Sequence, residues 1–307
     1  GAAGMSLRRS VLNLSLRLFE KPYLARASNP VQLRNGFERK ARLWFRPPQG
    51  SDFETGNCGA VPVVWALGPG VTRDDGPAIV YFHGGGYVFG SPATHRAMLA
   101  RLSSLTGLPA CLPDYGLAPE HPFPRAVDDG LAVIEALSAH PGGMILGGDS
   151  AGGGLALAIL AQVLQDGGPR PRGLFAFSPL TDFTFSGESV RSNARADVML
   201  PASRANEMAA MYLQDADPTD PRASPLFAAF TRAAPVWLAA SDTEILRDDT
   251  RRMTARLRAQ GVAVTEALHP DLPHAWPIFQ GLLPEADETL HDLAGWISSL
   301  SRRPDGN

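Results

Sequence analysis

Apolar runs of strand length alternate with longer helical patterns along most of this chain, and that alternation restricts the fold more than any other feature. It predicts an α/β fold with right-handed crossovers and a mostly parallel sheet that carries helices on both faces. The first two strands have no helix between them and should pair antiparallel at one edge. The eight predicted strands are Ala41–Arg46, Val61–Ala66, Ala78–His83, Pro109–Leu112, Met144–Gly147, Gly173–Phe177, Val236–Ala239 and Val262–Leu268. The predicted helices are Leu7–Glu20, Thr94–Thr106, Ala126–Ala139, Ala151–Gln165, Ala202–Leu213, Arg247–Gln260 and Glu285–Leu300.

One connection is much longer than a crossover needs. The sixth and seventh predicted strands are separated by 58 residues, and insertions of that length are usually functional or disordered. Apolar side chains such as Phe183 and Met208 argue against disorder. We therefore expect a single domain over 5–307, with a helical cap formed by two separate pieces, 5–40 and 181–225.

The composition argues against several classes of function. The 307 residues carry a net charge of -3, which disfavours nucleic acid as the main partner. The two cysteines, Cys58 and Cys111, cannot form a disulfide framework or a cysteine-rich zinc site. No apolar run approaches the roughly 20 residues of a membrane-spanning helix. We expect a cytoplasmic protein without stable membrane insertion.

Charge is distributed unevenly along the chain. Residues 1–50 carry a net charge of +8, and the remainder carries -11. A basic amphipathic segment of this kind can rest on an anionic membrane. We favour the simpler interpretation, in which the segment is a basic surface helix that covers part of the globule.

A glycine-rich segment follows the predicted strand at Met144 and contains Ser150 in a Gly-x-Ser-x-Gly pattern. A strand, a tight turn and a helix are the context in which such a serine becomes an exposed nucleophile. The alternative is a glycine loop that binds phosphate. Lys21 and Lys40 are the only lysines and neither follows a glycine, which excludes a Walker-type loop.

A serine nucleophile needs hydrogen-bond donors for the oxyanion that develops during attack. His83 and three glycines directly follow the third predicted strand, and their backbone N–H groups are unshielded. Two of these N–H groups could point into a site beside Ser150. The N–H of Ala151, the residue after the serine, would be a third donor.

The general base should be a histidine in a loop after a late strand. His269 and His274 both follow the eighth predicted strand, and we favour His274 because it lies deeper in the loop. The acid that orients this histidine should follow the seventh strand, where Asp242 and Glu244 are both candidates. Position alone does not separate these two. No His-x-x-x-His spacing supports a metal site.

These motifs together resemble the hormone-sensitive-lipase-like esterases of the α/β-hydrolase fold. The resemblance extends over roughly residues 80–275 in the order serine, acid, histidine. One departure is Gly116, where many members carry arginine. The matching segments are His83-Gly84-Gly85-Gly86, Asp114-Tyr115-Gly116-Leu117-Ala118-Pro119-Glu120-His121-Pro122-Phe123-Pro124, Gly148-Asp149-Ser150-Ala151-Gly152-Gly153, Glu244-Ile245-Leu246-Arg247-Asp248 and His274.

The resemblance assigns roles to individual residues. It implies that Ser150 attacks an ester carbonyl and that His274 accepts the serine proton. Alignment on Leu246-x-Asp248 places Glu244, rather than Asp242, at the family's acid position. The implied oxyanion donors are the N–H groups of Gly84, Gly85 and Ala151. The family also has a cap, and its members frequently form homodimers, so a homodimer is a weak expectation here.

The expected activity is hydrolysis of a small-molecule carboxylic ester through an acyl-enzyme, with no cofactor. Relatives of this size mostly favour short acyl chains, so short-chain esters are the expected substrates. Amide or formamide hydrolysis on the same scaffold is the alternative. A non-catalytic receptor for small molecules is a third hypothesis, which the presence of both Ser150 and His274 disfavours.

Overall fold

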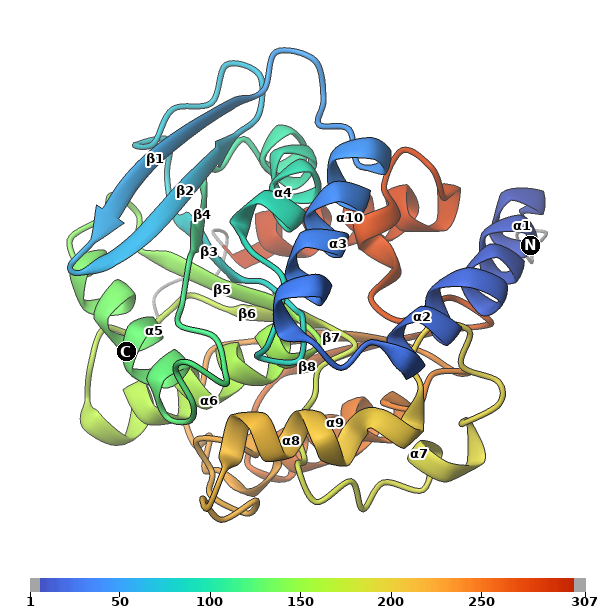
Figure 1. Ribbon diagram of the computed structural model, residues 1–307. Helices are drawn as coiled ribbons and strands as arrows, with labels where there is room; N and C mark the ends of the chain where they lie inside the picture. The colour runs from blue at the N-terminus through green and yellow to red at the C-terminus, as the bar shows by residue number, and fades with distance from the viewer. Residues whose placement is uncertain (1–5, 301–307) are drawn as a thin grey trace.

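A computed structural model of the chain describes residues 6–300 and contains one eight-stranded sheet (Figure 1). The strands are β1 (Asp52–Cys58), β2 (Val61–Leu67), β3 (Ala78–Phe82), β4 (Ala110–Pro113), β5 (Met144–Asp149), β6 (Leu174–Phe177), β7 (Val236–Ser241) and β8 (Val264–His269). Their spatial order is β1-β2-β4-β3-β5-β6-β7-β8. The pairs β1–β2 and β2–β4 are antiparallel, and every other pair is parallel. The predicted α/β class with a mostly parallel sheet is confirmed.

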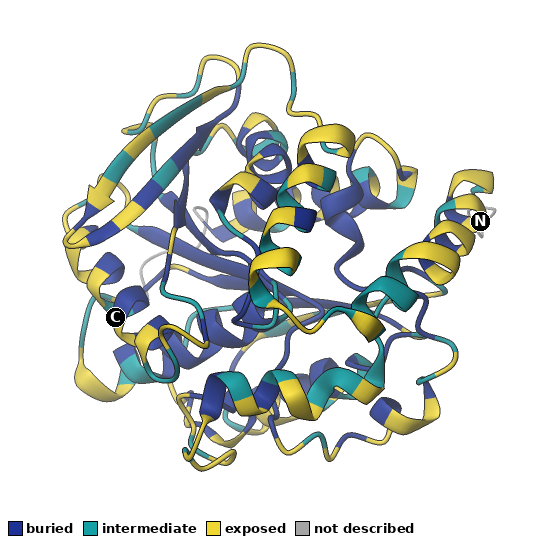
Figure 2. Cartoon of the chain, in the orientation of Figure 1, coloured by how far each residue is buried: buried dark blue, intermediate teal, exposed yellow. Residues whose placement is uncertain are grey.

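Helices cover both faces of the sheet (Figures 1 and 2). The α-helices are α1 (Leu7–Ser15), α2 (Lys21–Arg26), α3 (Pro30–Trp44), α4 (Pro92–Thr106), α5 (Arg125–Ala136), α6 (Ala151–Asp166), α7 (Ser189–Ser192), α8 (Ala205–Leu213), α9 (Arg247–Ala259) and α10 (Pro284–Leu300). A π-helical turn, Leu16–Glu20, joins α1 to α2. One hydrophobic cluster packs α4 and α10 on one face, and a second packs α5, α6 and α9 on the other.

The prediction of a strand at Ala41–Arg46 was wrong. Most of that segment is the last turn of α3, and the first strand is β1, which follows it. Asn29 starts α3 by accepting a hydrogen bond from the Val31 N–H at 2.9 Å, and Pro30 occupies the first turn. β1 escaped detection because it is an edge strand whose side chains are mostly exposed or half-buried, so its sequence lacks an apolar alternation.

The two pieces predicted to form the cap contact each other through side-chain bonds to backbone carbonyls. Lys21 Nζ donates to the Ala194 oxygen at 2.8 Å, and Arg17 donates to the Arg195 oxygen at 2.8 Å. A guanidinium nitrogen of Arg204 donates in the other direction, to the Ala27 oxygen. The N-terminal helices and the insertion therefore form one continuous cover. The predicted domain spans 5–307, and its two ends, residue 5 and residues 301–307, lie outside the residues that the structure describes.

Candidate active site

Ser150 lies in the turn between β5 and α6, in a backbone conformation that side chains rarely adopt. Its φ is 55° and its ψ is -125°. A non-glycine residue in such a region costs on the order of 1–3 kcal/mol, so the surroundings must hold it there. The Ser150 N–H donates to the Phe177 oxygen at 2.9 Å, and its carbonyl accepts from the Leu180 N–H at 2.9 Å. The end of β6 and the residues that directly follow it thus fix the turn that presents the half-buried serine.

Glycine is required beside this turn because the chain approaches β3 closely. A Cβ atom on Gly152 would overlap the backbone oxygens of Phe82 and His83. The first turn of α6 can therefore lie directly against the end of β3. This contact brings Ser150 next to the glycine loop that follows β3.

His274 and Glu244 form a buried pair. His274 Nδ1 lies 2.9 Å from Glu244 Oε1, and the two side chains are almost fully removed from solvent. The other carboxylate oxygen, Oε2, accepts from the Ser178 hydroxyl at 2.7 Å and from the Ser241 N–H at 2.9 Å. The glutamate is thereby held in one orientation, and it leaves Nε2 as the free nitrogen of the His274 ring.

The environment of His274 favours its protonated form. Burial alone would lower the pKa of His274, but the hydrogen bond to Glu244 and the negative charges of Glu244, Asp197 and Asp149 raise the pKa above its usual value. The surroundings of His274 therefore stabilise the imidazolium that forms when the ring accepts a proton.

The two alternative candidates lie elsewhere. Asp242 is exposed and accepts a hydrogen bond from the Asp271 N–H at 2.8 Å. His269 ends β8, and its ring packs against Trp276 with 5.1 Å between ring centroids. Burial lowers the pKa of His269. Neither side chain lines the cavity that holds Ser150 and His274.

The glycine loop differs from expectation at one position. The Gly84 N–H donates to Asp149 Oδ1 at 3.0 Å, so it is already engaged and does not point to a ligand. This contradicts the donor role expected of Gly84. Among the described residues, no hydrogen bond uses the N–H of Gly85, Gly86 or Ala151. Gly85 and Gly86 line the same cavity as Ser150, and Ala151 directly follows Ser150 in the chain.

Asp149 organises the floor of the site and was not singled out from the sequence. Besides the Gly84 N–H, its carboxylate accepts from the Tyr81 hydroxyl at 2.7 Å and contacts His95 Nε2 at 3.1 Å. Burial would raise the pKa of Asp149, but His95 and Tyr81 hold it below its usual value. The available signal was its place next to Ser150 inside the glycine-rich motif.

Two further contacts hold the glycine loop. The Tyr115 hydroxyl donates to the His83 oxygen, and the two rings stack with centroids 4.4 Å apart. His83 Nδ1 lies 2.7 Å from the Gly84 oxygen. Burial lowers the pKa of His83 to about 3, so the ring is neutral at ordinary pH. This histidine shapes the loop through its ring contacts.

Two polar residues also position Glu244: Ser178 lies just before the long insertion, and Asn193 lies within it. Ser178 donates to Glu244 and accepts from the Ala275 N–H at 3.0 Å. Asn193 donates to the backbone oxygens of Asp242 and Glu244 at 2.9 and 2.8 Å. Sequence reasoning missed both, because these contacts join positions that are 49 to 97 residues apart.

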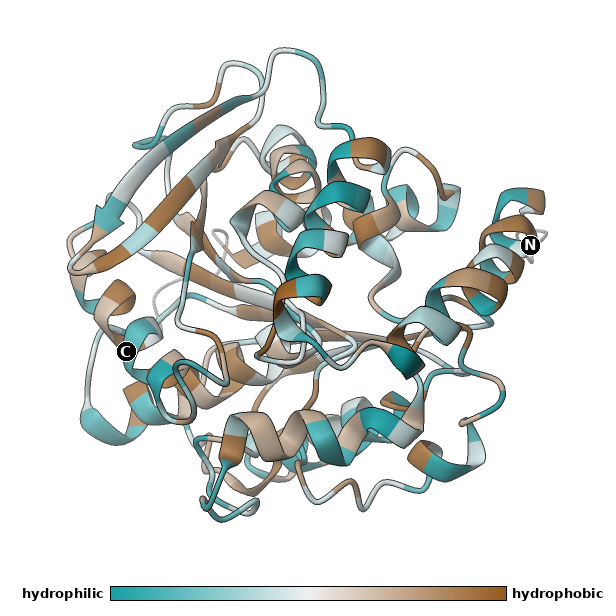
Figure 3. Ribbon diagram, viewed as in Figure 1, coloured by the Kyte–Doolittle hydropathy of each residue, from teal (hydrophilic) through white to brown (hydrophobic). Residues whose placement is uncertain are grey.

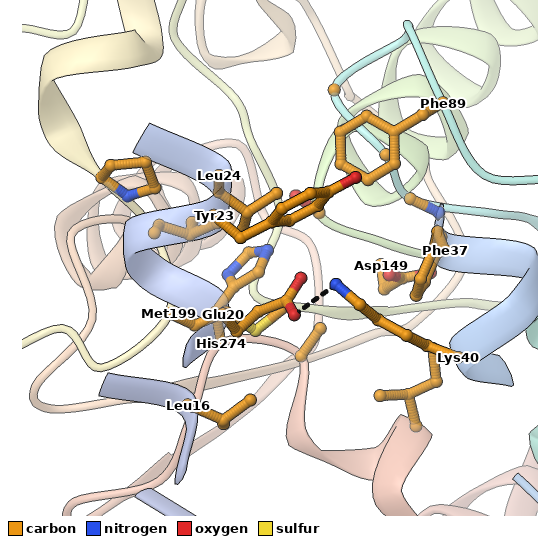
Figure 4. Close-up of a pocket in the computed structure, with 18 of the residues that line it drawn as sticks. Leu16, Glu20, Tyr23, Leu24, Phe37, Lys40, Phe89, Asp149, Met199 and His274 are labelled. Carbon is orange, nitrogen blue, oxygen red and sulfur yellow. Dashed lines mark hydrogen bonds and ion pairs between the residues drawn. The ribbon is translucent and has the colours of Figure 1, made fainter. Parts of the chain in front are cut away.

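Ser150 and His274 open into one cavity of about 1090 Å³ (Figure 4). The N-terminal helices contribute Leu16, Tyr23 and Phe37 to its wall, and the insertion contributes Met199 and Met208. The lining is mainly apolar. An exception is an ion pair between Lys40 Nζ and Glu20 Oε2 at 2.6 Å, which Figure 4 marks with a dashed line. The cavity suits a largely uncharged organic molecule.

Metal chemistry finds no support in the described part of the chain. Residues 6–300 contain no group of three or more His, Cys, Asp or Glu side chains that could hold a metal ion. Cys58 and Cys111 are free and buried. No helix within the same residues is long and apolar enough to cross a membrane.

Comparison with known proteins places this geometry in a family. Residues 79–278 match the family model described as the alpha/beta hydrolase fold. An esterase of Acinetobacter venetianus is 36% identical over 226 residues, which cover 72% of this chain and 75% of the relative. An acetyl-hydrolase of Streptomyces hygroscopicus is 33% identical over 251 residues, which cover 81% of this chain and 82% of the relative.

A solved structure agrees with these relatives along nearly the whole chain. The crystal structure of an esterase from the bacterial hormone-sensitive lipase family superimposes with a TM-score of 0.90 at 32% identity, covering 97% of this chain and 99% of that one. The fold, the serine turn and these similarities define an α/β hydrolase of the serine type. The chain belongs to the hormone-sensitive-lipase family and is a carboxylesterase.

Proposed function

We propose that Ser150, His274 and Glu244 are the catalytic triad and that the reaction is hydrolysis of short-chain acyl esters. The observation that carries this proposal is the buried bond between His274 Nδ1 and Glu244 Oε1 at 2.9 Å, next to a cavity lined by both His274 and Ser150. The bond fixes which ring nitrogen faces the cavity. Nε2 is then free to accept the proton of the serine hydroxyl.

In the first half of the reaction, Ser150 Oγ attacks the ester carbonyl carbon while His274 Nε2 takes the hydroxyl proton. Glu244 stabilises the imidazolium that results. The carbonyl oxygen becomes an oxyanion, and the intermediate collapses when His274 returns the proton to the departing alcohol. Water then attacks the acyl-enzyme in the same way and releases the acid and free serine.

We assign the oxyanion donors to the N–H groups of Gly85, Gly86 and Ala151. The engagement of the Gly84 N–H by Asp149 supports this choice over the set expected from the sequence. Gly85 has a φ of 128° and Gly86 a φ of 61°, which turn successive N–H groups in ways that other residues rarely allow. Loss of one such donor usually costs about 10²–10³ in kcat.

Two observations support a short acyl chain. A relative that covers most of this chain is an acetyl-hydrolase. Close to the proposed oxyanion donors, Met208 lies against Gly86, and the Tyr87 ring stacks on Tyr212 with centroids 3.8 Å apart. Met208 also lines the cavity, so it limits the depth available next to the reacting carbonyl. The wide part of the cavity is then left for the alcohol group.

The test uses p-nitrophenyl esters from acetate to decanoate. We expect the highest kcat/KM at acetate or butyrate, and Ser150→Ala should lower kcat by on the order of 10⁴–10⁶. Ser104→Ala, at an exposed serine of α4, is the matched control and should leave kcat unchanged. Mass spectrometry after treatment with an organophosphate should locate the label on Ser150. Absence of turnover on every ester, or labelling of another serine, would overturn the triad, and an optimum at decanoate would overturn the short-chain assignment.

A further inference from the structure

The N-terminal part of the cap carries most of the large apolar side chains that this protein exposes. Leu7, Phe19 and Trp44 are 80%, 73% and 59% exposed. Of the eleven large hydrophobic residues that are exposed within residues 6–300, eight lie within 7–44; they are Leu7, Val11, Leu14, Leu18, Phe19, Val31, Leu43 and Trp44. Isolated exposed hydrophobic residues are ordinary, but a concentration on one segment marks an interaction surface.

These side chains form a stripe along α1 and its π-helical extension. Leu7, Val11, Leu14 and Leu18 follow one another at spacings of four, three and four residues, which places them on one helix face. Figure 3 shows bands of apolar and polar residues alternating along α1. The buried face of the same helix is formed instead by Arg9, Asn13 and Leu16. Leu14 and Leu18 of this stripe lie outside the cavity lining, whereas Leu7 and Val11 line the cavity.

The charges around the stripe have one sign. Arg8 on α1 and Arg17 on the π-helical turn flank it, and Arg26, Arg39 and Arg42 are exposed on α2 and α3. Among residues 6–300, none of these five arginines forms an ion pair with an acidic group. The acids of the segment are both half-buried: Glu20 pairs with Lys40, and Glu38 accepts from the Ser91 hydroxyl. The exposed charged residues within 7–44 are therefore all arginines.

The same surface surrounds the entrance to the cavity. Leu7, Val11, Phe19 and Trp44 are exposed and also line the cavity wall, as does Leu282 from the opposite side. A continuous apolar path therefore leads from the outer surface of the cap to Ser150. An apolar substrate could follow this path without crossing bulk water.

We propose that this face of the cap, residues 7–44, binds the surface of an anionic lipid membrane and delivers lipid-soluble esters from it to the cavity. An apolar helix face flanked by arginines is the pattern of helices that lie in a membrane interface without spanning the bilayer. Each arginine near an anionic surface adds attraction. A second copy of this chain is a poorer occupant, because a symmetric contact would place like-charged arginines opposite each other. The binding depends on the surface and not on the proposed triad.

Binding is measured by flotation of the full-length Ser150→Ala protein with vesicles, so that hydrolysis does not disturb the lipid. Vesicles contain equal parts of phosphatidylglycerol and phosphatidylcholine, or phosphatidylcholine alone. We expect binding to the anionic vesicles that weakens as salt is raised. Failure to bind the anionic vesicles at low salt, or equal binding to both compositions, would overturn the proposal.

Two pairs of variants separate the charges from the apolar stripe, and none of the substituted residues lines the cavity. Arg39→Glu with Arg42→Glu, and separately Leu14→Ser with Leu18→Ser, should each weaken binding about tenfold or more. The matched controls are Arg170→Glu with Arg232→Glu, and Phe227→Ser, which change exposed residues far along the chain from the stripe. Controls that weaken binding as much as the test variants would overturn the assignment to this face.

Measurements on the active enzyme test whether a second copy of the chain occupies this face and whether the proposed triad is correct. In the protein with Ser150 intact, the two test pairs should leave turnover of a water-soluble acetate ester unchanged, and they should slow turnover of a lipid-soluble ester that is supplied in anionic vesicles. Light scattering should show no change in mass for the stripe variant; a dimer that dissociates in this variant would identify a second copy as the occupant and overturn the proposal. Loss of all esterase activity with intact vesicle binding would instead reject the triad.

Discussion

Glu244 and Asp242 are two residues apart, and their carboxylates lie in different surroundings. Glu244 is buried against His274, whereas Asp242 is exposed and ties down the backbone at Asp271. The longer side chain reaches the imidazole from the first turn after β7. The distance along the sequence between the two candidates carries no information about which of them turns inward.

Replacement of the two acids should therefore have unequal effects. Glu244→Gln should lower kcat by on the order of 10⁴, because the amide no longer stabilises the imidazolium and can favour the wrong tautomer. Asp242→Asn, the matched control, should change kcat by less than about threefold. Steady-state kinetics on p-nitrophenyl acetate provide the measurement. A larger loss in the Asp242 variant would show that the acid has been assigned to the wrong residue.

The pH dependence of kcat/KM should report His274. The base acts in its neutral form, so activity falls as pH decreases through the pKa of His274, which lies above its usual value of 6.5. Burial lowers this pKa, and Glu244 is the main group that raises it. On the acidic side of the profile, the residual kcat/KM of the Glu244→Gln variant should therefore fall at a lower pH than the kcat/KM of the parent enzyme. His269→Gln is the control and should leave the profile in place; a shift there would contradict the assignment.

The first turn of α9 anchors the start of the cap insertion. Asp249 Oδ2 accepts from the Thr181 N–H at 2.8 Å and from the Asp182 N–H at 3.2 Å, while Oδ1 is buried without a partner. Burial raises the pKa of Asp249 from 3.8 to about 7, against the effect of the Thr181 hydrogen bonds. A proton on Oδ1 agrees with both observations. The insertion is thus attached through a carboxyl group that prefers to be neutral.

This attachment predicts a pH-dependent stability. A carboxyl group with a raised pKa in the folded state stabilises the fold below the unfolded pKa of about 4, and this stability is lost as pH rises towards about 7. Across this window the parent protein should lose free energy of unfolding relative to Asp249→Asn, by up to about 1.4 kcal/mol per pH unit. Urea unfolding at pH 5 and at pH 7.5 measures the difference. A constant difference between the two proteins would show that Asp249 is ionised throughout.

Helix α1 is fastened to the loop that carries His274. Asn13 Nδ2 donates to the Asp271 backbone oxygen at 3.0 Å, and Arg9 donates to the Pro270 oxygen at 3.4 Å. Asn13→Ala removes the stronger of these bonds and should destabilise the attachment by about 1 kcal/mol. Limited proteolysis should then release the N-terminal segment faster than in the parent protein. Asn35→Ala, at an exposed position of α3, is the matched control and should not change the cleavage rate.

On the scale of the whole molecule, the sequence predicts the parts of the fold and site that depend on local pattern. The parallel strands, the turn at Ser150 and the loop of His274 follow from periodicity and from glycine placement. The edge strand β1 was missed because exposure removes its apolar alternation. Ser178 was missed because its partner Glu244 is 66 residues away.

The glycine loop shows a second limit to what can be predicted from the sequence. Its position after β3 is evident in the sequence, but the direction of each N–H depends on backbone angles that glycine leaves open. Only the carboxylate of Asp149, which arrives from β5, decides that the Gly84 N–H turns towards the core. The assignment of individual donors therefore needs the tertiary structure.

The attachment of α1 also has a consequence for how the protein is made. Ser6 bonds to Glu285, 279 residues later, and Asn13 bonds to Asp271, 258 residues later. During synthesis, Ser6 and Asn13 leave the ribosome long before these partners are translated. The polar side chains that fasten α1 must therefore wait, unpaired, for most of that interval. The attachment of α1 can form only after the loop that carries His274 has been made.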